Sequence, residues 1–393
     1  MKKILVIHHG VGVGGGLIAL LGLLEDLKTK YEVKVLSIFD SEASEYIRKT
    51  GVEVYFPKSK FYSKFYNLFI HSEASYFGII YYIRNLKNLL TFFLSKYYFS
   101  KRELLNLNFE YDVVYLNSTF ISDWSFGAKK NEKKVVIHVR EPLAKGAVGL
   151  RKRLIRNTII KYCDKVIAIS KDNAHRVGLL KKTTIIYDPV VLKYRNTTSV
   201  PITLETKYKY FLYLGGMQRI KGFEQLVNSL PFIDNDIKIC FLGGGFTTSH
   251  NKIKRLISLV DPYMWRINNL LKRLDESDKI INIGLVDNIF DYYNNTIALI
   301  SPFSKPHASL PILEAFSVGK PVIVSDIEGM NEIVTVENGF FFKNNNPKDL
   351  AEKINEFAKL DNEKIKQLGD NAKNKYLSIV NNNPHIIKVL ENL

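Results

Sequence analysis

At 393 residues the chain exceeds the size of one ordinary hydrophobic core and fits two domains. A hydrophobic fraction of 46% excludes wholesale disorder, and two isolated cysteines, Cys163 and Cys240, exclude a disulfide framework and a cysteine metal site. The net charge of +17 indicates a nucleic acid, an anionic membrane or a phosphorylated substrate as partner, unless it only reflects an organism rich in lysine, asparagine and isoleucine.

The N-terminal stretch resembles a signal peptide only at first sight. Lys2 and Lys3 precede apolar residues, but His8 and His9 interrupt the run and no cleavage site precedes Glu25. No later run reaches the roughly 18–20 uncharged apolar residues of a membrane span. We therefore expect a cytoplasmic protein, peripheral on the inner face of the cell membrane.

The first half of the chain alternates between strand and helix patterns. An apolar strand at 3–8 leads into a glycine loop at 10–16 and a helix at 17–29. Further strands are predicted at 32–39, 51–56, 112–116, 134–139, 165–169 and 183–186. Short apolar runs separated by helices predict a parallel sheet that is covered on both faces.

A polar stretch with two prolines, 187–208, breaks this rhythm and reads as a linker. The alternation then restarts, with strands at 210–214, 237–242, 279–283, 297–301 and 321–324, helices at 222–230, 310–318 and 347–358, and a helical insertion at 251–275. The predicted fold is α/β, with two Rossmann-like doubly wound parallel-sheet domains facing a cleft. We expect the domains at 1–190 and 209–377, a linker at 191–208, and a C-terminal helix at 378–393 that packs back on the first domain.

The glycine loop carries Gly10, Gly12 and Gly15 in a G-x-G-x-x-G pattern between a strand and a helix. Such glycines let a phosphate approach the backbone, and the helix that begins near Gly16 offers N–H groups to an anion. A dehydrogenase would need an acidic residue after the second strand, where Asp40 is a loose candidate. A turn that merely connects strand to helix explains the pattern equally simply.

The second half carries its own phosphate-binding features. Arg219 and Lys221 follow a strand and precede a helix, where two cations suit a nucleoside diphosphate leaving group. Further along, Glu314 lies in the first turns of a helix and can accept both ribose hydroxyls, while Ser309 and Leu310 offer backbone N–H groups to phosphate.

These motifs follow one another in a fixed order: Arg219–Gly222, Gly243–Gly245, Leu310–Ala315, Gly319–Asp326, Glu332–Val334 and Asn338–Gly339. The motifs and the order in which they occur resemble those of the retaining GT-B glycosyltransferases of family 4 (glycosyltransferase group 1). The resemblance is strong over residues 210–360. The glycine loop, residues 163–170 and His138–Glu141 extend it over most of the chain.

The resemblance implies a hexosyltransferase that needs no cofactor and no metal. It assigns acceptor binding to 1–190 and nucleotide-sugar binding to 209–377, with Lys221, Arg219 and His138 as catalytic residues. Its donor-binding residues are Gly15, Gly16, Gly216, His307, Ser309, Leu310 and Glu314. The chain departs from the family at Pro306, where a second glutamate is usual, and at Gly216, where an arginine is common. His307 or backbone would then contact the donor sugar, and Arg219 would replace the missing arginine.

The partners expected on this basis are a UDP- or GDP-sugar and a glycan or polyprenyl-linked acceptor in bacterial cell-surface polysaccharide synthesis, such as lipopolysaccharide or capsule. Three alternatives remain. A sugar-nucleotide epimerase or hydrolase shares the architecture, and an NAD-dependent oxidoreductase rests on the glycine loop alone. A nucleic-acid binder rests on charge alone, and we expect no nucleic acid because no recognised module accompanies that charge.

Two local features of the first half have competing interpretations. His138 ends a predicted strand and either faces the cleft near the acceptor or is simply solvated, and Arg140 and Glu141 are either site residues or a salt-bridged pair. Residues 58–103 hold eight Lys or Arg, two Glu and fourteen Phe or Tyr. That mixture favours an anionic membrane surface, unless the aromatic rings pack against the sheet.

Overall fold

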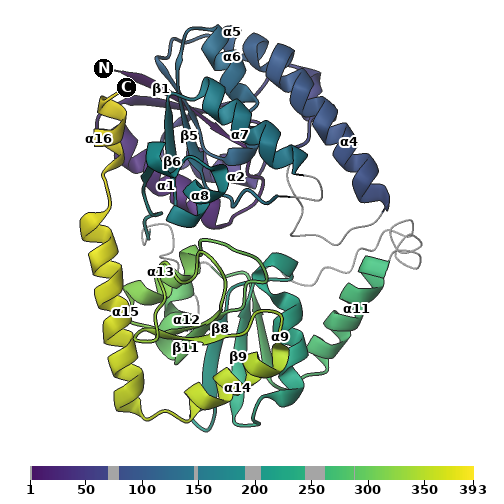
Figure 1. The fold of residues 1–393 in the computed structure, drawn as a ribbon, viewed down its shortest axis with the longest axis vertical. Coiled ribbons are helices and arrows are strands. Elements are labelled where there is room, and N and C mark those ends of the chain that lie inside the picture. The colour runs from purple at the N-terminus through teal and green to yellow at the C-terminus, as the bar shows by residue number, and fades with distance from the viewer. Residues whose placement is uncertain (1, 70–78, 146–148, 191–204, 244–261, 287) are drawn as a thin grey trace. The chain divides into compact units, whose positions relative to one another are not determined.

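The computed structural model describes residues 2–69, 79–145, 149–190, 205–243, 262–286 and 288–393. The described residues form two compact units (Figure 1). Unit 1 comprises the chain up to His71, Ile80–Val191 and Asn382–Leu393, and the body of unit 2 lies in Leu192–Asn381.

Unit 1 is built on a seven-stranded sheet in the order β3-β2-β1-β4-β5-β6-β7, with every pairing parallel. All four residues of β4 are buried, because helices cover both faces of the sheet. The strands are β1 (Lys3–His8), β2 (Glu32–Ser37), β3 (Glu53–Tyr55), β4 (Val113–Leu116), β5 (Lys134–Val139), β6 (Lys165–Ala168) and β7 (Thr183–Ile185).

The helices of unit 1 include one from the end of the chain. They are α1 (Gly15–Lys28), α2 (Glu42–Arg48), α3 (Lys60–Lys64), α4 (Ile79–Leu94), α5 (Ser100–Leu105), α6 (Trp124–Lys130), α7 (Leu150–Tyr162), α8 (Lys171–Val177) and α16 (Ile386–Glu391). A π-helical turn, Ser95–Phe99, joins α4 to α5. The last helix, α16, packs on α1, and an ion pair between Lys30 and Glu391 fastens it there.

Unit 2 repeats the pattern with a six-stranded parallel sheet in the order β10-β9-β8-β11-β12-β13. Its strands are β8 (Lys209–Tyr213), β9 (Ile237–Leu242), β10 (Ile280–Gly284), β11 (Ala298–Ser301), β12 (Val322–Ser325) and β13 (Gly339–Phe342). Its helices are α9 (Phe223–Ser229), α11 (Pro262–Asp275), α12 (Ile289–Asn295), α13 (Leu310–Ser317), α14 (Pro347–Ala358) and α15 (Asn362–Asn382).

The predicted α/β class with two Rossmann-like sheets is confirmed. The cleft concerns how the two units are placed together and stays a prediction. Of the expected insertion, 251–261 lies outside the described residues, and the described helix begins at Pro262. None of the described helices combines the length and the apolar character that crossing a membrane requires.

In both sheets the chain reverses its order of winding at one place, between β1 and β4 and between β8 and β11. Ligands of doubly wound sheets bind outside the carboxyl ends of the strands at such a point. The predicted site residues follow β1, β8 and β11, except His138, which lies next to the carboxyl end of β5. Each unit therefore carries its candidate residues at this edge of its sheet.

Candidate active site

The turn after β8 is built on glycines that let backbone segments touch. The Tyr213 hydroxyl donates to the Gly216 carbonyl at 3.0 Å, and a Cβ on Gly215 would come within 1.9 Å of that hydroxyl. A Cβ on Gly243, in the turn after β9, would come within 2.6 Å of the Gly216 Cα. Gly216 therefore lies where two strand ends meet and where a ligand can approach the backbone.

The loop after β11 holds the helical turn Arg219–Lys221 in position. Ser304 donates twice to that turn, from its backbone N–H to the Ile220 carbonyl and from its hydroxyl to the Arg219 carbonyl, both at 2.9 Å. Gly222 follows with φ of +79°, and a Cβ there would come within 1.6 Å of the Pro302 carbonyl oxygen. Only glycine satisfies both the left-handed conformation and this contact.

Gly222→Ala is therefore expected to lower the free energy of unfolding of unit 2 by about 2–5 kcal/mol, from left-handed strain and overpacking together. Gly284→Ala is the matched control, because Gly284 has φ of +81° and no atom near its would-be Cβ. Urea unfolding measures both variants. Equal losses in the two would show that the contact with Pro302 contributes nothing.

Lys221 and Glu314 are brought together within unit 2. Glu314 lies in α13 with 2% of its surface exposed, and its Oε2 is 3.4 Å from the hydroxyl of Tyr293, which donates at 2.8 Å to the Pro311 carbonyl. Burial lowers the pKa of Lys221, and the charge of Glu314 acts against that shift. A half-buried cation and a buried carboxylate thus share this edge of the sheet.

The start of α13 gathers the other predicted residues of unit 2. Ser309 precedes the helix with 3% exposure, and its hydroxyl has no hydrogen-bond partner among the described residues. The His307 ring stacks on Phe303 with ring centres 4.6 Å apart, and Leu310 begins the helix. The amino end of a helix and a buried hydroxyl are both suited to phosphate oxygens.

In unit 1 the glycine loop leads directly into α1. Gly15 and Gly16 form the first turn of that helix and are exposed, as an anion-binding turn requires. Gly10 lies against His8, since a Cβ on Gly10 would come within 2.5 Å of His8 Nε2. A larger side chain at position 10 would therefore require the His8 ring to move.

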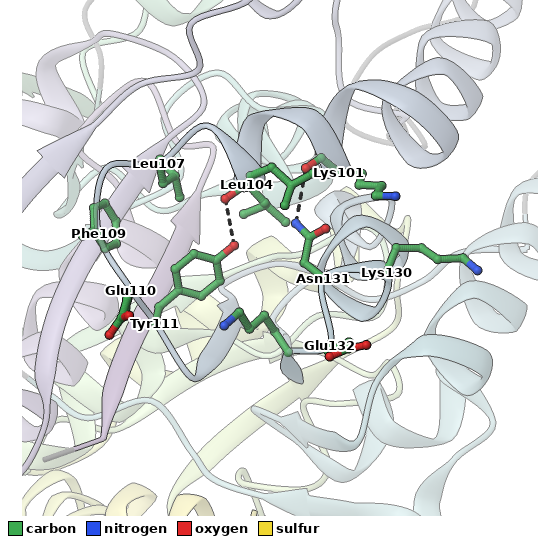
Figure 2. A pocket seen from close by; sticks show the side chains of 11 residues that line it. Lys101, Leu104, Leu107, Phe109, Glu110, Tyr111, Lys130, Asn131 and Glu132 are labelled. Carbon is green, nitrogen blue, oxygen red and sulfur yellow. Dashed lines mark hydrogen bonds between the residues drawn. The ribbon is translucent and has the colours of Figure 1, made fainter.

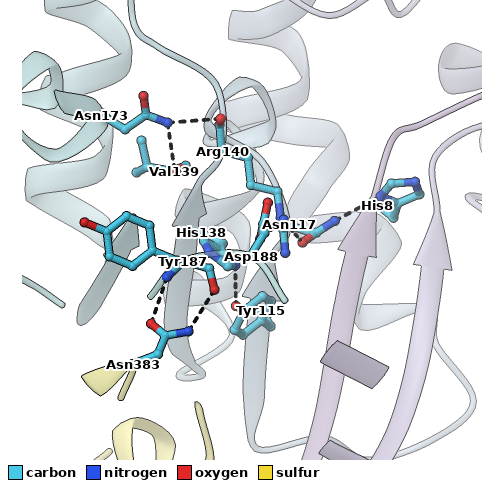
Figure 3. Close-up of polar contacts among 10 residues, drawn as sticks. All are labelled: His8, Tyr115, Asn117, His138, Val139, Arg140, Asn173, Tyr187, Asp188 and Asn383. Atoms are coloured by element: carbon cyan, nitrogen blue, oxygen red, sulfur yellow. Dashed lines mark hydrogen bonds and ion pairs between the residues drawn. The ribbon is translucent and has the colours of Figure 1, made fainter. Parts of the chain in front are cut away.

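A buried chain of hydrogen bonds runs across the strand ends of unit 1 (Figure 3). The Arg140 Nε–H can only donate, and it donates to Asn117 Oδ1 at 2.8 Å. The Asn117 amide nitrogen therefore faces His8 Nδ1 at 3.2 Å and donates to it, so His8 carries its proton on Nε2. Burial, followed by the charges of His9 and Arg140, lowers the pKa of His8 to about 3. This imidazole is neutral at physiological pH.

His138 is buried, with 3% of its surface exposed, so the solvated interpretation is wrong. It lies within β5, and its Nδ1 is 2.8 Å from the hydroxyl of Tyr115 on the neighbouring β4 (Figure 3). Burial and then the charge of Arg140 hold the pKa of His138 well below its usual range. Its Nε2 has no hydrogen-bond partner among the described residues.

Arg140 and Glu141 do not pair with each other in the contacts that we observe. Arg140 forms an ion pair with Asp188, which follows β7. Glu141 instead accepts from the Ser118 hydroxyl at 2.8 Å and from the Thr119 backbone N–H at 2.9 Å. Each residue fixes a different loop at the carboxyl edge of the sheet, so of the two interpretations the salt bridge between them is wrong.

The chain is similar to known glycosyltransferases in sequence and in structure. Residues 195–375 match the family Glycosyl transferases group 1. This match lies within Leu192–Asn381, the body of unit 2, and covers a little under half of the chain. An uncharacterized glycosyltransferase of Methanocaldococcus jannaschii is 25% identical over 255 residues, which are 63% of this chain and 65% of that relative's length.

Solved structures share the fold. Anabaena HepE in complex with UDP-glucose superposes with a TM-score of 0.74 and 16% identity, over 100% of both chains. A lipopolysaccharide outer core galactosyltransferase superposes with a TM-score of 0.60 and 16% identity, also over 100% of both chains. The likeness to GT-B structures therefore extends over the whole chain and not over residues 195–375 alone.

Several residues that hold the site loops of unit 2 and unit 1 in place were not predicted from the sequence. Gln225 donates to the Pro302 carbonyl at 3.0 Å and accepts from the Asn345 backbone N–H at 2.8 Å, but nothing in its helical context distinguishes it. Asn117 and Asp188 carried a usable signal, because each follows a predicted strand at its carboxyl end.

A cavity of about 490 Å³ lies on unit 1 and is distinct from these residues (Figure 2). Tyr111 and Lys133 line it and come just before β4 and β5, whereas Asn117 and Arg140 follow those strands. The cavity therefore opens at the opposite edge of the sheet from the candidate site. Burial raises the pKa of Tyr111 to about 12, and its hydroxyl donates to the Leu104 carbonyl at 3.0 Å.

Proposed function

We propose that this protein is a glycosyltransferase that moves a hexose from a UDP- or GDP-sugar to a glycan or lipid-linked glycan. The observation that carries the proposal is the proximity of buried Glu314, in α13 after β11, to the half-buried cation Lys221, in the helical turn after β8 of unit 2. One group suits the ribose hydroxyls and the other the diphosphate. The likeness to HepE, which was solved with UDP-glucose, supports a nucleotide-sugar donor.

The donor diphosphate would lie between Lys221, Arg219 and the amino end of α13. The orphaned Ser309 hydroxyl and the backbone at Leu310 support this position, because they offer donors to phosphate oxygens. Gly216 would let the donor approach the backbone, and His307 would contact its sugar where Pro306 replaces the usual glutamate. In unit 1 the residues that we propose for donor binding are Gly15 and Gly16, in the exposed first turn of α1.

The mechanism that we propose retains the anomeric configuration. As the bond between sugar and phosphate breaks, negative charge builds on the diphosphate, where preorganised cations and helix N–H groups stabilise it. A phosphate oxygen takes the proton of the acceptor hydroxyl. Two side-chain cations and a helix end make a divalent metal unnecessary for this charge, so we propose transfer without metal or other cofactor.

The acceptor would bind to unit 1 beside His138, whose buried Nε2 has no hydrogen-bond partner among the described residues. Likeness to a lipopolysaccharide galactosyltransferase supports a cell-surface glycan, as in bacterial lipopolysaccharide or capsule synthesis. An acceptor of this kind is carried on lipid, which suits a protein at the inner face of the cell membrane.

The test incubates the protein with UDP-glucose, UDP-galactose and GDP-mannose, with and without a polyprenyl-linked glycan, in the presence of EDTA. We expect release of nucleotide and formation of an α-linked product only when acceptor is present. Release without any acceptor would favour the epimerase or hydrolase instead. Activity that EDTA abolishes and magnesium or manganese restores would contradict the metal-free mechanism.

A further inference from the structure

The helical segment from α4 through the π-helical turn has one buried and one exposed face. The buried face holds Asn88, Thr91, Phe92 and Ser95, which face the interior of unit 1. The side chains on the opposite face are large and at least 42% exposed, reaching 69% at the first of them: Leu86, Leu90, Leu94, Tyr97 and Tyr98. Leucines four residues apart form one stripe on a helix, so this face is apolar where a surface helix is normally polar.

Several of the aromatic residues predicted to meet a membrane are instead buried inside unit 1. Phe61, Tyr62 and Tyr66 belong to the buried core of unit 1, and Phe69 and Phe92 are buried against each other. Tyr76 and Phe77 lie outside the described residues. Among the side chains that the structure describes, the apolar surface of the segment therefore comes mainly from the leucine stripe and two tyrosines.

The charges around the stripe are of one sign. From Asn85 to Arg102 the chain has no acidic residue, and Lys87, Lys101 and Arg102 are exposed. The neighbouring α7 also has no acidic residue and carries five cations, of which Arg153 is exposed. Such a surface is complementary to a polyanion.

Two contacts hold α7 beside this segment. Arg151 donates to Asn85 Oδ1 at 3.0 Å, and Lys96 donates to the Thr158 hydroxyl at 2.9 Å. Lys96 is thereby buried and belongs to the joint between the two elements. In Figure 1, α4 borders unit 1 with α5, α6 and α7 beside it. The exposed cations of α7 thus add to the charge around the stripe.

We propose that this face of unit 1, the leucine stripe with its surrounding cations, docks on anionic phospholipid. Leucine side chains enter the boundary between headgroups and acyl chains, while lysine and arginine bind lipid phosphates. A second copy of the chain is a poor occupant, because two such faces would oppose cation to cation. A nucleic acid would leave the leucines in water. The proposal uses no residue of the donor site, so it stands or falls independently of the proposed function.

The experiment measures co-sedimentation of the full chain with vesicles of phosphatidylcholine alone or with about a third of phosphatidylglycerol. We expect binding to the anionic vesicles at low salt, release as salt rises, and no binding to the neutral ones. Leu86→Gln, Leu90→Gln and Leu94→Gln together should lower the partition coefficient at least about tenfold. Lys87→Gln, Lys101→Gln and Arg153→Gln together should lower it roughly a hundredfold.

The matched control removes the same net charge from α15 of unit 2, through Lys364→Gln, Lys366→Gln and Lys373→Gln, all exposed. It should bind within about twofold of the wild type, and every variant should keep the wild-type melting temperature. An equal loss in this control would make the binding a diffuse charge effect and overturn the proposal. So would failure of the wild type to bind anionic vesicles, or a dimer in sedimentation equilibrium that the leucine variants abolish.

Discussion

Lys221→Ala is expected to slow sugar transfer by about 2–4 kcal/mol of transition-state stabilisation, roughly a thirty- to thousandfold fall in kcat/KM. The cation is half-buried and preorganised beside the carboxylate of Glu314, so no water can replace it cheaply when charge develops on the leaving diphosphate. Steady-state transfer kinetics measure the loss. Lys221→Met, which keeps most of the packing, should be as slow, because the charge and not the side-chain volume is what matters.

Glu314→Ala should act on another part of the donor and weaken nucleotide binding through the ribose. Lys366→Ala, on the exposed surface of α15, is the control and should leave the kinetics unchanged. The pH profile gives a second check. Because burial lowers the pKa of Lys221, transfer should decline on the alkaline side at lower pH than for an ordinary lysine, and Lys221→Arg should remove that decline. Near-normal rates for Lys221→Ala and Glu314→Ala in well-folded protein would refute this donor site.

Asp123→Asn is expected to stabilise unit 1 at pH 8 by up to about 4 kcal/mol. Asp123 is fully buried, where it accepts hydrogen bonds from Ser95 and, at 3.1 Å, from the Tyr66 hydroxyl. Burial raises its pKa from 3.8 to about 7. Between these values the folded state keeps a proton that the unfolded chain has lost, so stability falls as the pH rises through this window.

Denaturant unfolding at several pH values between 4 and 8 tests this expectation. The asparagine variant should lose most of the slope between pH 4 and pH 7, since an amide cannot ionise and its neighbouring hydroxyls can rotate to accept from it. Glu110→Gln, at an exposed position, should keep the slope of the wild type. An unchanged slope in Asp123→Asn would mean that this carboxyl group ionises as readily in the fold as in the unfolded chain.

Every observed strand except β13 could be predicted from the sequence, because a parallel sheet buried on both faces needs short apolar runs and these stand out between charged helices. Ile237–Leu242 is a clear case, since it is buried at every position and bounded by charge or glycine. The surroundings of single side chains could not be predicted in the same way. His138 is buried because β4 brings Tyr115 beside it. The register that pairs β4 with β5 cannot be predicted from the residues of either strand alone.

Lys96 shows the same limit on the surface. Its sequence context is that of a solvated lysine, yet α7 provides Thr158 and the ring of Tyr162 and encloses it. Glycines were more informative, because the reason for a glycine is local. Gly222 stands at a left-handed position in a turn that the chain must close tightly, and its role follows from that turn together with one contact.

The docking of α16 on α1 has a consequence for biosynthesis. Unit 1 is completed by Asn382–Leu393, which a ribosome delivers only after all of unit 2. Until then α1 lacks the buried contacts of Ile386, Val389 and Leu390. The hydrogen bonds between Tyr187 and Asn383, both at 2.9 Å, also form only at this stage. The unit that is translated first can therefore be completed only after the whole of unit 2 has been synthesised.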